Sequence, residues 1–97
     1  MYRMYKMYKM YKMYKMLDDR IVFLVNDAIK GEAEFRKASE DVLDVFHIFV
    51  DDEYRGQGIA NTFMDLLVKY CEIYDYKMKC SCPYAKKWME KHGKEIV

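Results

Sequence analysis

The sequence predicts a mixed α+β domain in which antiparallel strands precede a β-α-β unit and a C-terminal helix. Two observations favour this order. Short runs rich in β-branched and alternating apolar residues occupy much of the chain from Arg20 to Val50, as expected of strands. From Ile59 to Tyr74 the apolar residues instead recur every three or four positions, as on one face of a helix. A turn that contains two glycines separates the two patterns.

Composition limits the class of protein. The chain has 97 residues, which allows one domain at most. Its net charge of +1 hides an asymmetry, because residues 1–16 hold five bases and no acid, whereas residues 17–97 hold 12 bases and 16 acids. The acidic second part argues against nucleic-acid binding outside the first sixteen residues. The sequence has no apolar run long enough to span a membrane and no segment of secretory type. Its three cysteines are an odd number and do not suggest a set of disulfides. We therefore expect a cytoplasmic protein with no membrane span.

The first sixteen residues repeat the triplet Met-Tyr-Lys, with one arginine at Arg3. A period of three matches neither the 3.6-residue period of a helix nor the two-residue period of a strand, so no face collects the apolar side chains. We therefore expect residues 1–16 to form a disordered low-complexity tail and residues 17–97 to form the domain. The alternative is a basic, aromatic arm that binds single-stranded nucleic acid or an acidic membrane.

The N-terminal half of the domain reads as a series of hairpins. Residues 20–25 are rich in β-branched and aromatic side chains and predict a strand, and Asn26 and Asp27 predict a turn. Residues 30–36 alternate between small or apolar and charged side chains, which predicts a half-exposed strand. Residues 42–50 are apolar apart from Asp44 and His47, which predicts a central strand that is covered on both faces.

The C-terminal half predicts a helix, a strand and a second helix. The first helix starts at Ile59 and ends near Asp75, and residues 77–82 then form a strand parallel to residues 42–50 through a right-handed crossover. Pro83 suits the first turn of the last helix, and Gly93 suits its end. The predicted inner face of that helix consists of Tyr84, Ala85, Trp88, Met89 and His92.

The turn before Ile59 predicts an anion site. The first amides of a helix have no partner in the helix, and they lie at the positive end of its dipole. Gly56 and Gly58 would let a phosphate approach the backbone closely. Because the carboxyl ends of parallel strands lie at one edge of a sheet, the helix that follows Val50 and the helix that follows Cys82 should open onto a single cleft.

Three glycine motifs are compatible in part with this turn. A Walker phosphate loop would need a Gly-Lys-Ser/Thr ending, which is absent, and a dinucleotide fingerprint would need a small residue at Asn61. The remaining pattern is Arg55-x-x-Gly58-x-Ala60, which resembles the coenzyme A signature of the GNAT superfamily of N-acetyltransferases. A plain glycine turn that starts a helix would look similar.

The resemblance to the short single-domain GNAT proteins extends over about residues 20–94. It includes the strand end at residues 47–50 (His-Ile-Phe-Val), the glycine turn, and residues 80–85 (Cys-Ser-Cys-Pro-Tyr-Ala), which open the last helix. The chain departs from that pattern at Ile48, where the family has threonine, and at Asp51, where it has proline.

The resemblance implies acetyl-CoA as cosubstrate, acetyl transfer from its thioester to an amine acceptor, and a GNAT-like sheet. A non-catalytic CoA-binding or acyl-CoA-binding module is the alternative, because extra N-terminal helices that help to build the acceptor site in full-size members have no counterpart here. The residues assigned to the coenzyme are Val50, Arg55, Gly56, Gln57, Gly58, Ile59 and Ala60.

Cys82 and His47 are the candidate catalytic residues. A helix N-terminus favours the thiolate of Cys82, which would make it a nucleophile beside the thioester, although a small residue at a tight cap is the alternative. His47 is either a histidine satisfied within the core or a general base. Tyr84 would protonate the leaving thiolate or simply pack the last helix. Cys80 and Cys82 lack the spacing of a metal site, so we expect no metal.

Overall fold

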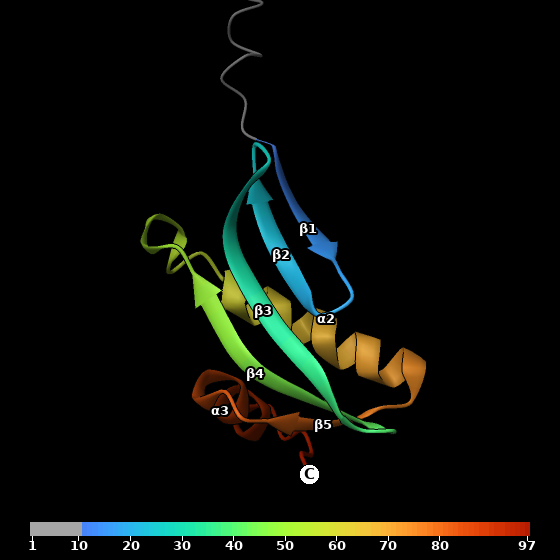
Figure 1. Cartoon of the computed structure of the whole chain (residues 1–97). Helices are drawn as coiled ribbons and strands as arrows, with labels where there is room; N and C mark the ends of the chain where they lie inside the picture. Colours follow the sequence, from blue (N-terminus) through green and yellow to red (C-terminus); the bar gives the residue numbers. More distant parts are fainter. Residues whose placement is uncertain (1–10) are drawn as a thin grey trace, which may run out of the picture.

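A computed structural model describes residues 11–97 as one mixed sheet with two helices (Figure 1). The sheet has five strands in the order β1-β2-β3-β4-β5. Neighbours among the first four strands are antiparallel, and β4 and β5 are parallel, as the sequence predicted. The elements are β1 (Lys12–Met16), β2 (Arg20–Val25), β3 (Ala28–Ser39), β4 (Val42–Val50), the 3-10 turn η1 (Asp52–Tyr54), α2 (Ile59–Tyr74), β5 (Lys77–Cys80) and α3 (Pro83–Lys91).

The hairpin between β2 and β3 turns through two residues in the left-handed region, Asn26 at φ 49° and Asp27 at φ 69°. Asparagine and aspartate tolerate this conformation better than other side chains, which is why they mark the turn in the sequence. β3 extends beyond the predicted residues 30–36 at both ends, because its backbone pairs with β2 and β4 after the alternation of its side chains has ended.

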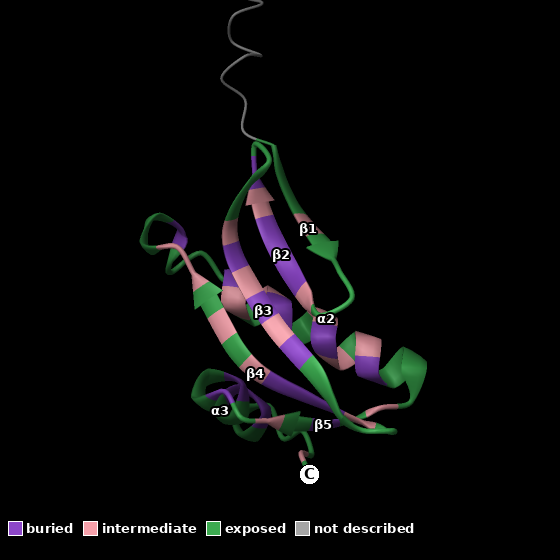
Figure 2. Cartoon of the chain, viewed as in Figure 1, coloured by how far each residue is buried: buried purple, intermediate pink, exposed green. Residues whose placement is uncertain are grey.

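The core lies between one face of the sheet and α2, which crosses behind it in Figure 1. Phe63, Met64 and Leu67 of α2 are fully buried against the strands, and Figure 2 shows the buried segments of β2 and β3 in front of this helix. Gly31 of β3 makes room for Phe63, since a Cβ atom there would lie 3.3 Å from the ring. α2 ends at Asp75, which adopts φ 59° and donates its backbone N–H to the carbonyl of Cys71.

Part of the Met-Tyr-Lys repeat is ordered, which differs from the expectation of a disordered tail. Lys12–Met16 pairs with β2 along its whole length as β1, and Tyr14 packs against Phe23 and Phe63 at centroid distances of 5.0 and 5.7 Å. Backbone pairing needs no side-chain period, and one inward tyrosine is enough to attach the strand to the core. The expectation for residues 1–10 lies outside the described residues.

The last helix, α3, packs beside β4 and β5 through Ala85, Trp88 and Met89, which are buried as predicted. Two further residues assigned to its inner face, Tyr84 and His92, are exposed instead. Among residues 11–97, neither helix is long and apolar enough to span a bilayer.

Candidate functional site

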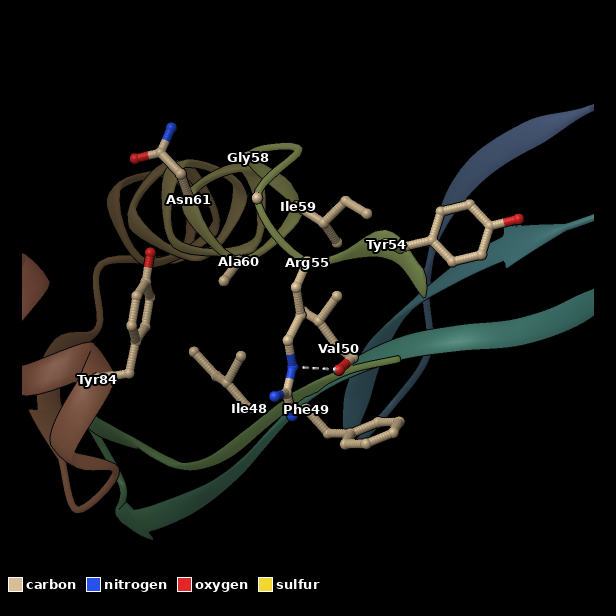
Figure 3. A pocket seen from close by; sticks show the side chains of 11 residues that line it. Ile48, Phe49, Val50, Tyr54, Arg55, Gly58, Ile59, Ala60, Asn61 and Tyr84 are labelled. Atoms are coloured by element: carbon tan, nitrogen blue, oxygen red, sulfur yellow. Dashed lines mark hydrogen bonds between the residues drawn. The ribbon is translucent and has the colours of Figure 1, made fainter. Parts of the chain in front are cut away.

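A cavity lies where β4, the glycine turn and the start of α2 meet. It has a volume of about 410 Å³, and Figure 3 shows it open between α2, the end of β4 and Tyr84 of α3. All but one of the residues assigned to the coenzyme line it, the exception being Gln57. The lining residues are Ile48, Phe49, Val50, Tyr54, Arg55, Gly56, Gly58, Ile59, Ala60, Asn61 and Tyr84.

The wall formed by the glycine turn presents backbone amides. Gly56 and Gly58 adopt φ 80° and 81°, and a Cβ atom at either position would meet no atom within 4 Å. The first amide that bonds back into α2 is that of Thr62, which donates to the carbonyl of Gly58 at 3.0 Å. Within residues 11–97, the six amides of residues 56–61 donate to no protein acceptor. They form a row of free donors at the positive end of a helix.

The acidic residues before the glycine turn, Asp51 and Asp52, lie outside the cavity and stabilise the local backbone. Asp51 caps η1 by accepting from the amide of Glu53 at 3.0 Å, and Asp52 lies 3.0 Å from the guanidinium of Arg55. Arg55 also donates from Nε to the carbonyl of Val50 at 3.2 Å, the bond drawn in Figure 3. Arg55 thereby ties the end of β4 to the glycine turn and leaves part of its guanidinium exposed at the cavity.

The second wall is an open edge of β4. β5 pairs with β4 only from Val42 to Val45, where the register ends at Cys80 (Figure 1). The amide of Cys82 then donates to the carbonyl of Val45 at 3.1 Å, after which the chain enters α3. From residue 46 to 50, β4 therefore has no strand partner on the side of β5, and Ile48 and Val50 line the cavity there. An extended ligand could pair with this edge as an added strand.

Cys82 lies at the point where β4 and β5 separate, at the N-cap of α3. It is buried, with 6% of its surface exposed, and it does not line the cavity. Tyr84, two residues later, does line it, and Figure 3 shows its hydroxyl group near the start of α2. Although Tyr84 is 42% exposed, its packing against the protein removes part of its hydration and raises its pKa, and the neighbouring Cys82 raises this pKa further. The phenol therefore keeps its proton at neutral pH.

Asp44 of β4 holds the connection between β5 and α3 in place. The sequence did not reveal this role, although an aspartate stands out in an apolar strand. Its carboxylate accepts from the amide of Ser81 at 3.0 Å and from the Ser81 hydroxyl at 2.9 Å. Arg36 also donates to it, at 3.2 Å. β5 therefore stops at Cys80 rather than at residue 82 as predicted, because a side chain takes the place of the next ladder bond.

Replacing Asp44 by alanine should lower the free energy of unfolding by about 3 kcal/mol, because it removes a buried carboxylate together with its two hydrogen bonds to Ser81 and its ion pair with Arg36. Urea denaturation followed by circular dichroism measures the loss. Asp41→Ala is the matched control, since Asp41 is an exposed aspartate 4.0 Å from Lys77, and its removal should cost less than about 0.5 kcal/mol. Equal losses in the two variants would contradict the role given to Asp44.

His47 lies on the face of the sheet opposite α2 and outside the cavity, so the interpretation as a core histidine is wrong. The imidazole Nδ1 lies 3.0 Å from a carboxylate oxygen of Glu34 on β3. The other oxygen of Glu34 lies 3.5 Å from Arg20 of β2. His47 is thus exposed and oriented by a carboxylate, an arrangement that suits a proton acceptor.

The two other cysteines, Cys71 and Cys80, lie outside the cavity. Burial raises the pKa of Cys71 to about 11 and that of Cys80 to about 12, so both are thiols at neutral pH. All three cysteines of the chain are free. No group of three potential metal ligands lies together among residues 11–97.

Comparison with known proteins agrees with this arrangement. A family model described as GCN5-related N-acetyl-transferase matches residues 20–96. No curated protein is similar enough in sequence to count as a match. Among solved structures, a GCN5-like protein from Staphylococcus aureus is 24% identical with a TM-score of 0.68, and the match covers 82% of this chain and 79% of that one.

Two further solved structures share the fold. A ribosomal-protein-alanine N-acetyltransferase from Brucella melitensis is 23% identical with a TM-score of 0.64, and the match covers 80% of this chain and 63% of that one. The aminoglycoside N-acetyltransferase AAC(6')-Iy, solved with CoA, is 16% identical with a TM-score of 0.59, and the match covers 84% of this chain and 64% of that one. This chain therefore spans less than two thirds of the length of these two proteins.

Proposed function

We propose, on the premise that the chain belongs to the GCN5-related N-acetyl-transferase family, that it transfers an acetyl group from acetyl-CoA to an amine. The observation that carries the proposal is the row of free amides at residues 56–61 beside an open strand edge, in one cavity. The amides suit the pyrophosphate of the coenzyme, and the strand edge suits the amide groups of its pantetheine arm. The solved complex of AAC(6')-Iy with CoA supports the choice of ligand.

From the two walls we infer where the thioester should lie. With its pyrophosphate at the start of α2, the coenzyme would run along β4 from Val50 towards Val45. Its sulfur would then lie near the point where the two strands separate, beside Cys82. The residues proposed to hold it are those lining this path and the adjacent Gln57, namely Val50, Arg55, Gly56, Gln57, Gly58, Ile59 and Ala60.

The reaction needs two proton movements around one acyl transfer. The neutral amine attacks the thioester carbonyl carbon, the new C–N bond forms, and the C–S bond breaks. Tyr84 is proposed to give its proton to the departing thiolate, because its raised pKa keeps the phenol protonated and its side chain lines the cavity. His47, oriented by Glu34, is proposed to take the proton that the amine releases. The phenolate and the imidazolium then return to their starting states by exchange with water.

Cys82 offers an alternative route with a covalent intermediate. Its thiolate would attack the carbonyl first, release CoA and carry the acetyl group, which the amine would then take over from the cysteine. The place of Cys82 at the N-cap of α3, where β4 and β5 separate, supports this role. Both routes share the same coenzyme site and the same products.

Binding of the coenzyme without transfer is a second candidate function. One observation favours it: neither His47 nor Cys82 lines the cavity. The chain also spans less than two thirds of two of its structural neighbours, so it lacks part of what those proteins contain.

A thermal-shift titration with acetyl-CoA, followed by an amine panel with detection of free thiol, tests the proposal. A ligand that binds only the folded state should add about 2.7 kcal/mol at a hundredfold excess over its dissociation constant. Stabilisation together with amine-dependent thiol release supports the transferase. Stabilisation without thiol release for any amine favours the binding module, and the absence of stabilisation contradicts both functions.

A further inference from the structure

We propose that the groove between the start of α2 and the outer side of α3 is a phosphate subsite that recognises the ribose 3′-phosphate of CoA through Lys87 and Lys91. This inference rests on the proposed function, because it assigns a place to a further part of the same coenzyme. It predicts that the protein distinguishes CoA from dephospho-CoA, which has the same pyrophosphate and pantetheine but lacks this one phosphate.

The groove is continuous with the coenzyme cavity. It has a volume of about 350 Å³, and two of its lining residues, Asn61 and Tyr84, also line the larger cavity. Figure 3 shows these two side chains at the side of the cavity where α2 and α3 come together. Asn61 follows Ala60 in the first turn of α2, so a pyrophosphate bound to the amides there would lie within about one helical turn of the groove.

The groove carries positive charge and no carboxylate. Its other lining residues are Lys87, Trp88, Lys91 and His92. Lys87 and Lys91 lie four positions apart on one face of α3, where two like charges repel each other. Within residues 11–97 no ion pair includes either of them, so both ammonium groups are available to an anion. An anion between the two ammonium groups would relieve this repulsion.

The floor of the groove is held rigidly. The indole Nε1 of Trp88 donates to the side-chain oxygen of Asn61 at 2.7 Å, which links α3 to the first turn of α2. His92 stacks on the indole with ring centroids 3.9 Å apart, and its Nδ1 donates to the carbonyl of Trp88 at 2.8 Å. The lysines therefore project from a surface whose position relative to the glycine turn is fixed, which is what recognition of two phosphate groups on one ligand requires.

The choice of ligand follows from the two sites together. A molecule that fills both must carry a diphosphate at the start of α2 and a second phosphate a short distance away, and the 3′-phosphate of CoA meets this condition. The pantetheine arm, which is uncharged, has no reason to occupy a groove with two free lysines.

Isothermal titration of CoA and dephospho-CoA tests the subsite. The unmodified protein should bind CoA at least about tenfold more tightly than dephospho-CoA, since charge-assisted bonds to two lysines are lost with the phosphate. In the double variant Lys87→Gln/Lys91→Gln, the two ligands should bind within about twofold of each other, because CoA weakens while dephospho-CoA does not. Lys86→Gln, an exposed lysine of α3 outside the groove, is the control and should keep the tenfold preference.

Three results would contradict the phosphate subsite at Lys87 and Lys91. Equal affinity of the unmodified protein for the two ligands would overturn the subsite and leave the proposed function standing. A preference for CoA that survives in the double variant would also overturn the assignment to these lysines. If neither ligand binds, the proposed function fails and the subsite fails with it.

Discussion

Replacing Gly58 by valine should weaken CoA binding at least about a hundredfold, measured by isothermal titration. Gly58 lies at φ 81°, and the space beside its Cα is empty where the pyrophosphate is proposed to bind. A branched side chain would enter that space and would also strain the left-handed backbone, so several of the six free amides would lose their direction. Each hydrogen bond from an amide to a charged phosphate contributes about 1.5–3 kcal/mol, so the loss of two accounts for the effect.

Gly93→Val is the matched control for this variant. Gly93 also adopts a left-handed conformation, at φ 64°, with open space beside it, but it lies after α3 and outside the cavity. Valine should therefore strain the backbone in a similar way at both positions, while only Gly58→Val should lose the coenzyme. An unchanged dissociation constant in a folded Gly58→Val protein would contradict the assignment of the glycine turn to the pyrophosphate.

Local signals predicted the elements that build the cavity. The spacing of apolar residues gave α2 its observed limits, and Asp75 ends the helix in a left-handed conformation that aspartate accepts. The run from Val42 to Val50 gave β4 correctly, and the two glycines marked the turn between these elements. Each of these features depends on residues close together in the chain, which is why the sequence alone was sufficient.

His47 shows what local patterns could not predict. Leu43 and Val45 face the core, and strict alternation would place His47 there too. The pairing with β3 instead skips Phe46, with Glu34 opposite His47 and Phe35 opposite Val45, so an extra residue reverses the alternation. Ile48 and Val50 consequently face the core, and His47 faces solvent beside Glu34.

The strands at the two edges of the sheet depend on partners far away in the sequence. β1 forms from a repeat with no strand period because β2 offers it a backbone edge and Phe63 of α2 packs against Tyr14. β5 ends early because Asp44, 37 residues before Ser81, accepts its amide. Neither the formation of β1 nor the early end of β5 can be predicted from the residues of the strand itself. The only hint of the early end of β5 is Asp44, an acidic residue within an otherwise apolar strand.

If the covalent route operates, replacing Cys82 by alanine should reduce kcat by about 100-fold or more, while the dissociation constant of CoA changes by less than about twofold. The thiol is proposed to lie beside the thioester, where the strands separate, yet it lines none of the cavity that should hold the rest of the coenzyme. Removing it therefore affects the reacting atoms and spares the contacts of the pyrophosphate. Steady-state kinetics with an active amine, together with titration of CoA, separates the two quantities.

Cys80→Ala is the control, because Cys80 is also a free cysteine and lies two residues earlier, outside the cavity. A loss of activity that comes from poorer packing should be similar in both variants, whereas a role at the thioester should lower kcat only for Cys82→Ala. Mass spectrometry of the unmodified protein mixed with acetyl-CoA and no amine then decides between the two routes. An acetyl group found on Cys82 supports the covalent route, since direct attack by the amine leaves the enzyme unmodified. Full activity in Cys82→Ala would reduce the cysteine to a small residue that fits the start of α3, and Tyr84 and His47 would then carry the chemistry.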